Sequence, residues 1–454
     1  MPDVLPWQLR AAFARSLSDM YGKEVPAYTS LLEVSHAVNA DVVERIGADA
    51  ERLGSIDRVT AERHGAIRLG TPREMAQVAK IFGAMGMHPV GFYDLREAAT
   101  SAAVPVISTA FRPVAADELA RNPFRVFTSM LTPSDRRFFS ADLQQRLENF
   151  LDAREIFSPE LIALAERAEA DGGLSTEDAD RFLHLATAAF ELSREPVDRA
   201  WYDELEKISA VAADIGGVPS THINHLTPRV LDIDDLYARM EARGITMIDD
   251  IQGPPRWEGP DVLLRQTSFR ALAEPRAFRM PDGSVETSSL RVRFGEVEAR
   301  GIALTREGRA IYDRAIAEVD ERAAGLDPAA RTEVKLEVWR REFPTTEAEL
   351  AARGLAYFTY AVKDGAVVPE PIVYEDFLPR SAAGIFQSNL TDDGSKDVSQ
   401  EGVERDADWM SGAIGRELAD PFELYARQSE ESRQAAAAQL GVSPEELLTK
   451  AHVG

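Results

Sequence analysis

The chain contains no cysteine in its 454 residues. This excludes disulfide bridges, zinc–thiolate sites, iron–sulfur clusters and thiol nucleophiles, and it fits a cytoplasmic protein. Long hydrophobic runs are also missing, because no stretch reaches the roughly eighteen apolar residues of a membrane helix. Positive charge is scarce, since 51 Lys and Arg stand against 76 Asp and Glu, a net charge of -25. We therefore expect neither nucleic acid nor an anionic membrane as a partner, because both require clustered basic residues.

The length and the 44% of hydrophobic residues are sufficient for one large domain or two intimate ones. Apolar residues at helical spacing predict helices over residues 5–60 and 143–213, and the Ala- and Glu-rich tail from residue 420 is also expected to be helical. Polar residues and glycine predict a loop at 391–402. Strands are therefore expected mainly between these helical regions.

A long, degenerate repeat organises the expected strands. The upstream copy reads as strand, helix and three strands: "RHGAIRLG", "TPREMAQVAKIFGAMG", "MHPVGFYDL", "VPVISTAFRPV" and "FRVFTSML". The downstream copy has the same order: "INHLTPRVL", "DIDDLYARMEARG", "ITMIDDI", "DVLLRQTSFRALA" and "SSLRVRFGEVEARGIAL". Two such βαβββ modules can pair their sheets into a half-barrel around a shared cavity.

The predicted fold class is therefore α+β, with two paired modules and added N-terminal, central and C-terminal helices. The expected boundaries are, in chain order, module one at about 61–131, a helical insertion at about 143–213 and module two at about 220–305. We expect residues 1–420 to form a single large catalytic domain and residues 421–454 a helical tail.

The few histidines are placed at matching points of the repeat. There are seven in the chain, and His64 and His225 each lie in the first strand of a module. Residues two apart on a strand share a face, so Arg68 points the same way as His64. In the last strand of module two, Glu296 and Glu298 share a face with apolar residues. A carboxylate there is costly to bury without a partner, and a metal ion is a suitable one.

Two histidines and one carboxylate make a facial triad, which leaves coordination positions open for substrate and dioxygen. Nitrogen and carboxylate ligands suit Fe(II), Mn(II) or Zn(II), and the spacing leaves both Glu296 and Glu298 open as the ligand. A lone histidine is more often structural than a ligand, and we expect this of His222, which faces away from His225 on the strand. Gln266, on the adjacent strand, is a further candidate for substrate contact.

The four other histidines are expected to be ordinary structural or surface residues: His36, His88, His184 and His452. Arg68 could likewise be a plain surface arginine. Beside a metal-bound His64, however, it is well placed to bind a carboxylate in a two-pronged geometry.

The order of strands and helices resembles the vicinal oxygen chelate superfamily. "INHL" resembles the I-D-H strand that carries the first iron ligand of 4-hydroxyphenylpyruvate dioxygenases, and "FGEVEAR" resembles their F-x-E-V-I-Q-R strand with its Glu ligand. Four longer segments resemble the 2-oxoadipate dioxygenase/decarboxylase family more closely: "RHGAIRLGT", "HINHLTPR", "LRQTSFRAL" and "RFGEVEARGIALTREGR". The resemblance extends from the N-terminal helices to the "DVSQEG" loop.

This resemblance implies a complete site. It selects three ligands for Fe(II), which are His64, His225 and Glu296. It also implies that Arg68 binds a carboxylate of the 2-oxo acid, and that Val398 and Ser399 contact the substrate at the mouth of the cavity. The implied reaction converts 2-oxoadipate and dioxygen into D-2-hydroxyglutarate and carbon dioxide, in lysine catabolism through 2-aminoadipate.

Two other functions compete with this one. A glyoxalase-like isomerase or hydrolase could use Zn(II) or Mn(II) on the same scaffold, and a relative without catalysis could bind a small molecule. Oxygen consumption separates both from a dioxygenase. The residues alone leave open the metal, the chain length of the preferred 2-oxo acid, the oligomeric state and the roles of the added helices.

Overall fold

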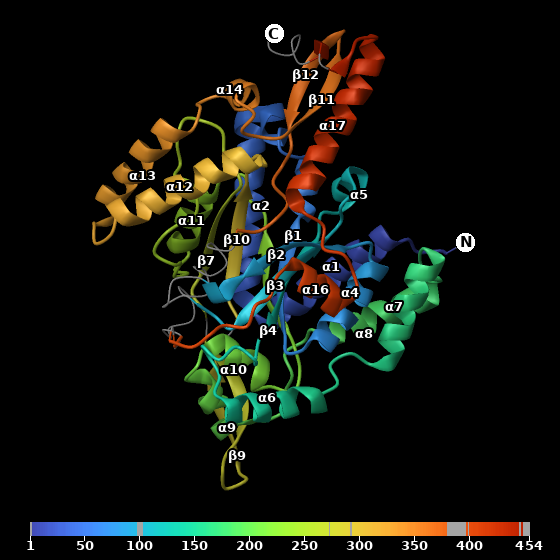
Figure 1. Cartoon of the computed structure of the whole chain (residues 1–454), viewed down its shortest axis with the longest axis vertical. Helices are drawn as coiled ribbons and strands as arrows, with labels where there is room; N and C mark the ends of the chain where they lie inside the picture. Colours follow the sequence, from blue (N-terminus) through green and yellow to red (C-terminus); the bar gives the residue numbers. More distant parts are fainter. Residues whose placement is uncertain are drawn as a thin grey trace.

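The protein is described from a computed structural model, which defines residues 2–97, 103–271, 273–290, 293–378, 396–397, 399–444 and 446–447. Figure 1 shows a central group of strands with helices packed around it. The chain is a mixed α+β protein, as its sequence predicts. Among the described residues, no helix is both long enough and apolar enough to cross a membrane.

The central sheet contains five strands in the order β2-β3-β4-β1-β6. Their bounds are β1 (Arg63–Leu69), β2 (His88–Asp94), β3 (Val106–Arg112), β4 (Arg125–Leu131) and β6 (Ile223–Pro228). β1 runs parallel to β4 and antiparallel to β6, so β1 joins the strands of the first expected module to the first strand of the second. Nearly every residue of β1, β3, β4 and β6 is buried, because the sheet is covered on both faces.

Helix α4 (Pro72–Ala84) makes the crossover from β1 to β2. It begins with a capping box, in which the Thr71 hydroxyl accepts from the Glu74 N–H and the Glu74 carboxylate accepts from the Thr71 N–H. The same carboxylate binds Arg154 through contacts of 2.7 and 2.9 Å. Gly86, with φ +68, ends the turn after the helix, where a left-handed backbone favours glycine.

The downstream strands differ from the sequence prediction. Helix α11 (Ile233–Ala242) follows β6 as expected, but residues 245–251 form no strand and take part only in an isolated bridge at Met247. Two adjacent aspartates and the following Gly-Pro-Pro oppose an extended strand here. β7 (Leu264–Phe269) pairs antiparallel with β10 (Gly295–Arg300), and the Val230 N–H donates to the Glu298 carbonyl at 2.8 Å, so β10 lies beside the end of β6.

A hairpin that the sequence prediction missed lies between β7 and β10. β8 (Glu274–Arg279) and β9 (Val285–Leu290) pair antiparallel, and the short β5 (Val197–Asp198) adds to β8. Asp282 and Gly283 form the turn, and Gly283 has φ +86. An Asp-Gly pair between two extended runs is a strong hairpin signal that was available in the sequence.

Helices surround these strands (Figure 1). The N-terminal set is α1 (Pro6–Glu24), α2 (Pro26–Ile46), η1 (Gly47–Glu51) and α3 (Ile56–Ala61). The central set is α6 (Ala141–Ala153), α7 (Pro159–Asp171), α8 (Thr176–Ala188), α9 (Arg199–Glu206) and α10 (Ala210–Gly216). Both sets confirm the helices predicted over 5–60 and 143–213. A serine side chain caps the N-terminus of four central helices: Ser140, Ser158, Ser175 and Ser209.

The chain after β10 builds a further layer, for most of which no prediction was made. Its elements are α12 (Arg306–Arg322), α13 (Pro328–Glu342), α14 (Glu347–Ala352), β11 (Phe358–Lys363), β12 (Ala366–Pro371), α16 (Ala407–Ile414) and α17 (Pro421–Leu440). Two shorter helices connect strands of the central sheet along the chain: η2 (Leu95–Glu97) follows β2, and α5 (Ala116–Arg121) follows β3. Helix α17 confirms the helix that the sequence predicts from residue 420.

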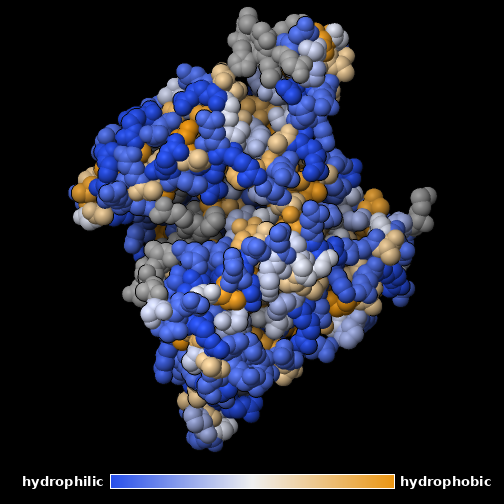
Figure 2. Space-filling view, viewed as in Figure 1, coloured by the Kyte–Doolittle hydropathy of each residue, from blue (hydrophilic) through white to orange (hydrophobic). Residues whose placement is uncertain are grey.

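Two hydrophobic clusters cover opposite faces of the central sheet. Ile67 belongs to the cluster with α1, α2, α4, α7 and α8, whereas its neighbour Ala66 belongs to the cluster with α6, α9 and α10. Alternate residues of a strand point to opposite faces, so His64 and Arg68 lie on the Ala66 face. Hydrophilic residues dominate the molecular face seen in Figure 2, with hydrophobic residues scattered over it.

Candidate metal centre

Three ligand-type side chains from three strands meet on the Ala66 face of the sheet. His64 on β1, His225 on β6 and Glu296 on β10 are all buried, and each offers one ligand atom within 4.8 Å of the others. The Nε2 atoms of His64 and His225 each lie 3.5 Å from a different oxygen of Glu296. The register explains this meeting, because Ala66 of β1 pairs with His225 and β10 lies beside β6.

The donor set fits a divalent metal ion. The two imidazole rings are nearly perpendicular, at 81°, with centroids 5.5 Å apart, so they are not stacked on each other. Phe377 packs against His64 at 4.9 Å and Phe294 against His225 at 5.1 Å, which keeps water from these faces of the rings. Two nitrogens and one carboxylate without a thiolate match the facial triad of a non-haem metal site.

The charges of the cluster also favour a cation. Burial acts to lower the pKa of His64, but Glu298 and Glu296 outweigh it and raise the pKa overall. Burial, together with His64 and Arg68, holds the pKa of His225 well below its ordinary value, so this ring is neutral. Burial raises the pKa of Glu296, although His64 opposes that rise. The two glutamates that stabilise a proton on His64 would stabilise a metal ion at the same place. The metal ion would replace that proton, because a histidine binds a metal through its neutral imidazole.

Glu298 lies at the other end of His64. Its Oε2 atom is 3.1 Å from His64 Nδ1, whereas Glu296 approaches Nε2. Arg300 holds the Glu298 carboxylate with two hydrogen bonds of 2.6 and 3.0 Å, and Arg125 lies 3.5 Å away. Burial acts to raise the pKa of Glu298, but Arg300, His64 and Arg125 lower it well below its ordinary value. A carboxylate beside the second nitrogen of a ligating histidine orients the ring and makes it a better ligand.

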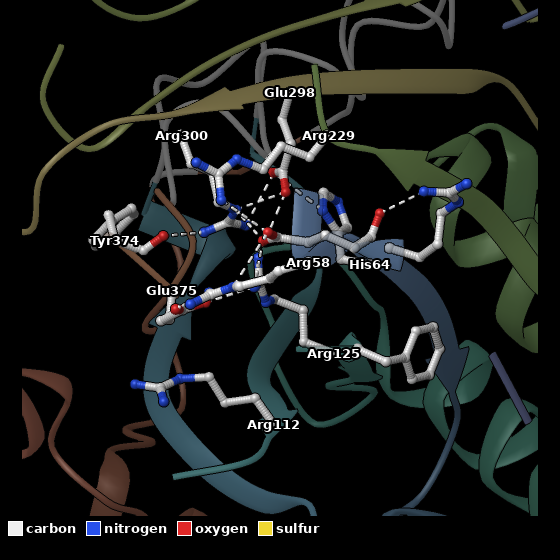
Figure 3. A network of polar contacts seen from close by, with 12 residues as sticks. Arg58, His64, Arg112, Arg125, Arg229, Glu298, Arg300, Tyr374 and Glu375 are labelled. Carbon is white, nitrogen blue, oxygen red and sulfur yellow. Dashed lines mark hydrogen bonds and ion pairs between the residues drawn. The ribbon is translucent and has the colours of Figure 1, made fainter. Parts of the chain in front are cut away.

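Behind Glu298 the buried charges continue as a network, which Figure 3 shows converging from several elements. Four arginines and three glutamates compose it: Arg58, Arg125, Arg229, Arg300, Glu62, Glu298 and Glu375. Arg125 binds Glu62 and Glu375 at 2.6 Å each, and Arg229 binds Glu62 at 2.9 Å. Sequence reasoning missed this network, although charged residues at the ends of apolar strands were a signal for it.

Arg68 enters a second polar cluster on the same face of the sheet. Its Nη1 atom donates to Asp214 Oδ2 at 2.6 Å, and the Asn224 amide donates to the same oxygen at 3.0 Å. His222 Nε2 lies 3.4 Å from Asp214 Oδ1, outside the triad, and burial lowers the pKa of His222 to about 4. Asp214 on α10 was not singled out in the sequence, because no local pattern connects it with Arg68.

The other expected substrate contacts are more dispersed. Gln266 is buried on β7 and pairs with Glu298 across the two strands, so both residues lie on one face. Ser399 is exposed, and its N–H and hydroxyl both donate to Asp397 Oδ1, at 3.0 and 2.6 Å. Val398 lies outside the described residues.

A buried cluster of two histidines and one carboxylate, carried by strands of a mixed α+β fold, is typical of non-haem metal-dependent enzymes. Comparisons with known proteins make the assignment specific. Residues 13–389 match the model of the family described as 2-oxoadipate dioxygenase/decarboxylase. The chain belongs to this family, as the resemblance in its sequence indicates.

Individual relatives cover almost the whole chain. A 2-oxoadipate dioxygenase/decarboxylase of Mycobacterium tuberculosis (strain ATCC 25618 / H37Rv) is 59% identical over 427 residues, which are 94% of this chain and 98% of the relative. A protein of the same name from Pseudomonas putida is 39% identical, over 97% of this chain and 98% of its own length. The crystal structure of the hydroxyglutarate synthase from Pseudomonas putida in complex with 2-oxoadipate is similar with a TM-score of 0.83 and 37% identity, over 97% of this chain and 99% of that one.

Proposed function

We propose that the protein is an Fe(II)-dependent dioxygenase and decarboxylase, which converts 2-oxoadipate and dioxygen into D-2-hydroxyglutarate and carbon dioxide. Both atoms of dioxygen are retained in the two products, so the reaction needs no second 2-oxo acid. The observation that supports this function is the buried cluster of His64, His225 and Glu296, in a chain whose relatives are named for this reaction.

His64, His225 and Glu296 would hold the iron through two nitrogens and a carboxylate. Three protein ligands leave coordination positions for a 2-oxo acid and for dioxygen, and bound Fe(II) supplies the redox chemistry that dioxygen requires. The protein orients the reactants and keeps the site dry. Phe294 and Phe377 serve the second purpose, because their rings pack against the two histidines.

Arg68 would bind a carboxylate of the substrate. Its guanidinium is buried on the same strand face as His64, four residues along β1, and Asp214 holds it in place. A guanidinium can bind a carboxylate with two parallel hydrogen bonds, which fixes both position and orientation. Such a fixed substrate presents one hydrogen for reaction, which supports a single stereoisomer as the product.

Three further substrate contacts belong to this proposal, namely Gln266, Val398 and Ser399. The burial of Gln266 on the face of Glu298 supports a contact inside the cavity. The exposure of Ser399 is consistent with a contact at the cavity mouth.

We further propose that the two groups of strands are the paired modules of a half-barrel of vicinal oxygen chelate type, in which residues 245–251 occupy the place of a strand in the second module without forming one. The position of β10 beside the end of β6 supports this arrangement. In the same proposal, residues 1–420 form one catalytic domain and residues 421–454 form a helical tail. The place in lysine catabolism and the cytoplasmic location stay predictions.

The test is oxygen uptake by protein loaded with Fe(II) under anaerobic conditions and then given 2-oxoadipate and air. We expect equal amounts of oxygen consumed and carbon dioxide released, with D-2-hydroxyglutarate as the product. His225→Ala should abolish uptake, whereas His184→Ala, which changes an exposed histidine on α8, should not. Iron-loaded protein that consumes no oxygen with 2-oxoadipate or with 2-oxo acids of similar length would refute the proposal and favour an isomerase or a binding protein.

A further inference from the structure

The hydroxyl of Tyr21 lies between the two chain segments that carry His225 and Glu296. Tyr21 is a fully buried residue of α1. Its hydroxyl donates to the Asn224 carbonyl at 3.1 Å and to the Phe294 carbonyl at 2.9 Å. Asn224 directly precedes His225, and Phe294 lies two residues before Glu296. One acceptor is enough to satisfy a buried tyrosine hydroxyl, so the second contact points to a role in joining the two strands.

β6 and β10 belong to different sheets and come together just beyond the end of β6. β6 is the edge strand of the central sheet, and a parallel bridge joins Arg229 to Glu298 of β10. Four residues earlier along both segments, the same alignment places His225 beside Phe294, and their ring centroids are 5.1 Å apart. The Tyr21 hydroxyl therefore joins the two segments at the end where His225 lies.

A bulge at Asn224 turns His225 toward the candidate metal centre. His225 lies opposite Ala66 of β1. Ile223 lies opposite the next residue, Ile67, so Asn224 is an extra residue in β6. In a regular strand, residues 223 and 225 would share a face. Here Ile223 packs in the hydrophobic cluster of Ile67, whereas His225 lies on the face of Ala66. The direction of the His225 ring therefore depends on the main chain at Asn224.

The packing of the Tyr21 ring holds the hydroxyl in place. The ring packs edge-on against Tyr28, with centroids 5.1 Å apart, and the Arg293 guanidinium lies 5.4 Å from its centre. Arg293 directly precedes Phe294 and also binds Glu24 of the same helix. Burial raises the pKa of Tyr21 well above its ordinary value, so the hydroxyl keeps its proton and remains a donor. Helix α1 therefore presents a fixed donor to the two carbonyls.

We propose that Tyr21 is a positioning residue of the candidate metal centre, whose hydroxyl sets the distance between His225 and Glu296 by binding the main chain beside each of them. This inference rests on the proposed function only in taking these two residues, with His64, as metal ligands. Without the hydroxyl, two buried carbonyls lose their donor, and the segments that carry them can shift relative to each other. Bonds from a metal ion to nitrogen and oxygen have narrow ranges of length, so such a shift weakens metal binding while the fold remains.

The experiment is a titration of the metal-free protein with Co(II), whose visible absorption spectrum depends on the geometry of its ligands. Tyr21→Phe removes one hydroxyl and keeps the ring. We expect its affinity for Co(II) to be lower by about 10-fold, and the spectrum of its bound Co(II) to differ from that in the wild-type protein. His225→Ala should abolish this spectrum, which ties the signal to the candidate metal centre.

Tyr28→Phe is the matched control. It removes the hydroxyl of the neighbouring buried ring, which contacts the side chains of Ser18 and Arg63. Both variants should unfold at a lower temperature without metal, since each loses a buried hydrogen bond, but Tyr28→Phe should keep the wild-type affinity and spectrum. The same concentration of Co(II) should raise the unfolding temperature less in Tyr21→Phe than in Tyr28→Phe, whichever of the two is less stable without metal.

A wild-type affinity and spectrum in Tyr21→Phe would overturn the proposal. Equal losses of affinity in Tyr21→Phe and Tyr28→Phe would also overturn it, because they would indicate a structural role alone. If the wild-type protein consumes no oxygen with Fe(II) and 2-oxoadipate, but Tyr21→Phe still binds Co(II) more weakly than Tyr28→Phe does, the positioning role is retained and the proposed function is refuted.

Discussion

Removing the negative charge of Glu298 should affect both the fold and the metal centre. Glu298→Gln keeps the size of the side chain but removes the charge that faces Arg300 at 2.6 Å, His64 at 3.1 Å and Arg125 at 3.5 Å. The network contains four arginines and three glutamates, so the variant increases its excess of positive charge from one to two. Removing one partner of a buried ion pair lowers the free energy of unfolding by about 3–5 kcal/mol. The loss should be near the lower figure here, because the amide oxygen of the glutamine still accepts hydrogen bonds.

The assay has two parts. Urea denaturation of the metal-free protein should show a free energy of unfolding lower by about 3 kcal/mol, with little change in its slope on urea. Iron titration should show an affinity lower by about 10- to 100-fold, because His64 loses the carboxylate that orients it. Glu286→Gln, which changes an exposed residue of β9, is the matched control and should alter neither quantity. If Glu298→Gln unfolds at the wild-type urea concentration and binds iron with wild-type affinity, the coupling between network and metal centre is refuted.

Three further predictions follow from the same contacts. Arg68→Ala should raise the KM for 2-oxoadipate by about 10-fold or more while the iron content stays at the wild-type level, since Arg68 lies outside the triad; loss of iron would contradict this. Glu296→Gln should lower the iron content measured by metal analysis but, unlike Glu298→Gln, cost little stability in the metal-free protein, because Glu296 is not bound by an arginine of the described network. The pKa of Glu298 and of Asp214 is lowered in the folded protein, so each stabilises the fold above its unfolded pKa of about 4 and loses that contribution as the pH falls through the folded pKa. Acid titration of the metal-free protein should therefore show a transition that is weaker in Glu298→Gln than in the wild-type protein.

Local periodicity accounts for the part of the site that the sequence predicts. Strand alternation places His64 and Arg68 on one face of β1 and both glutamates on one face of β10, and the structure has them so. The matching position of His225 followed from the repeat of strand and helix. These inferences hold because each depends on neighbours within a few residues or on a copied order of elements.

The contacts that the sequence does not predict are those between elements that are far apart along the chain. Glu296 and Glu298 approach opposite ends of His64 only because β10 lies beside β6, and no spacing along the chain specifies that contact. Asp214 meets Arg68 from a helix that is 146 residues away in sequence. The segment 245–251 has strand-like composition at its start, but its aspartates and the prolines that follow oppose a continuous strand, and only an isolated bridge forms at Met247.

The ion network also explains why His64 contacts a charged residue, Glu298, and not a hydrophobic side chain at its Nδ1 atom. An apolar neighbour would leave His64 Nδ1 buried without a polar partner, and a lone Glu298 would be a buried charge without compensation. Arg300 and Arg125 balance Glu298, and Arg125 also requires Glu62 and Glu375. Each buried charge therefore requires a further charge, until the network connects β4 with β10 and, through the contact of Glu298 with His64, with β1. β1 and β10 carry ligands of the candidate metal centre. The contacts that balance the buried charges therefore also fix the position of His64 relative to Glu296. A substitution in the ion network should change metal binding, and a substitution in the candidate metal centre should change the ion network.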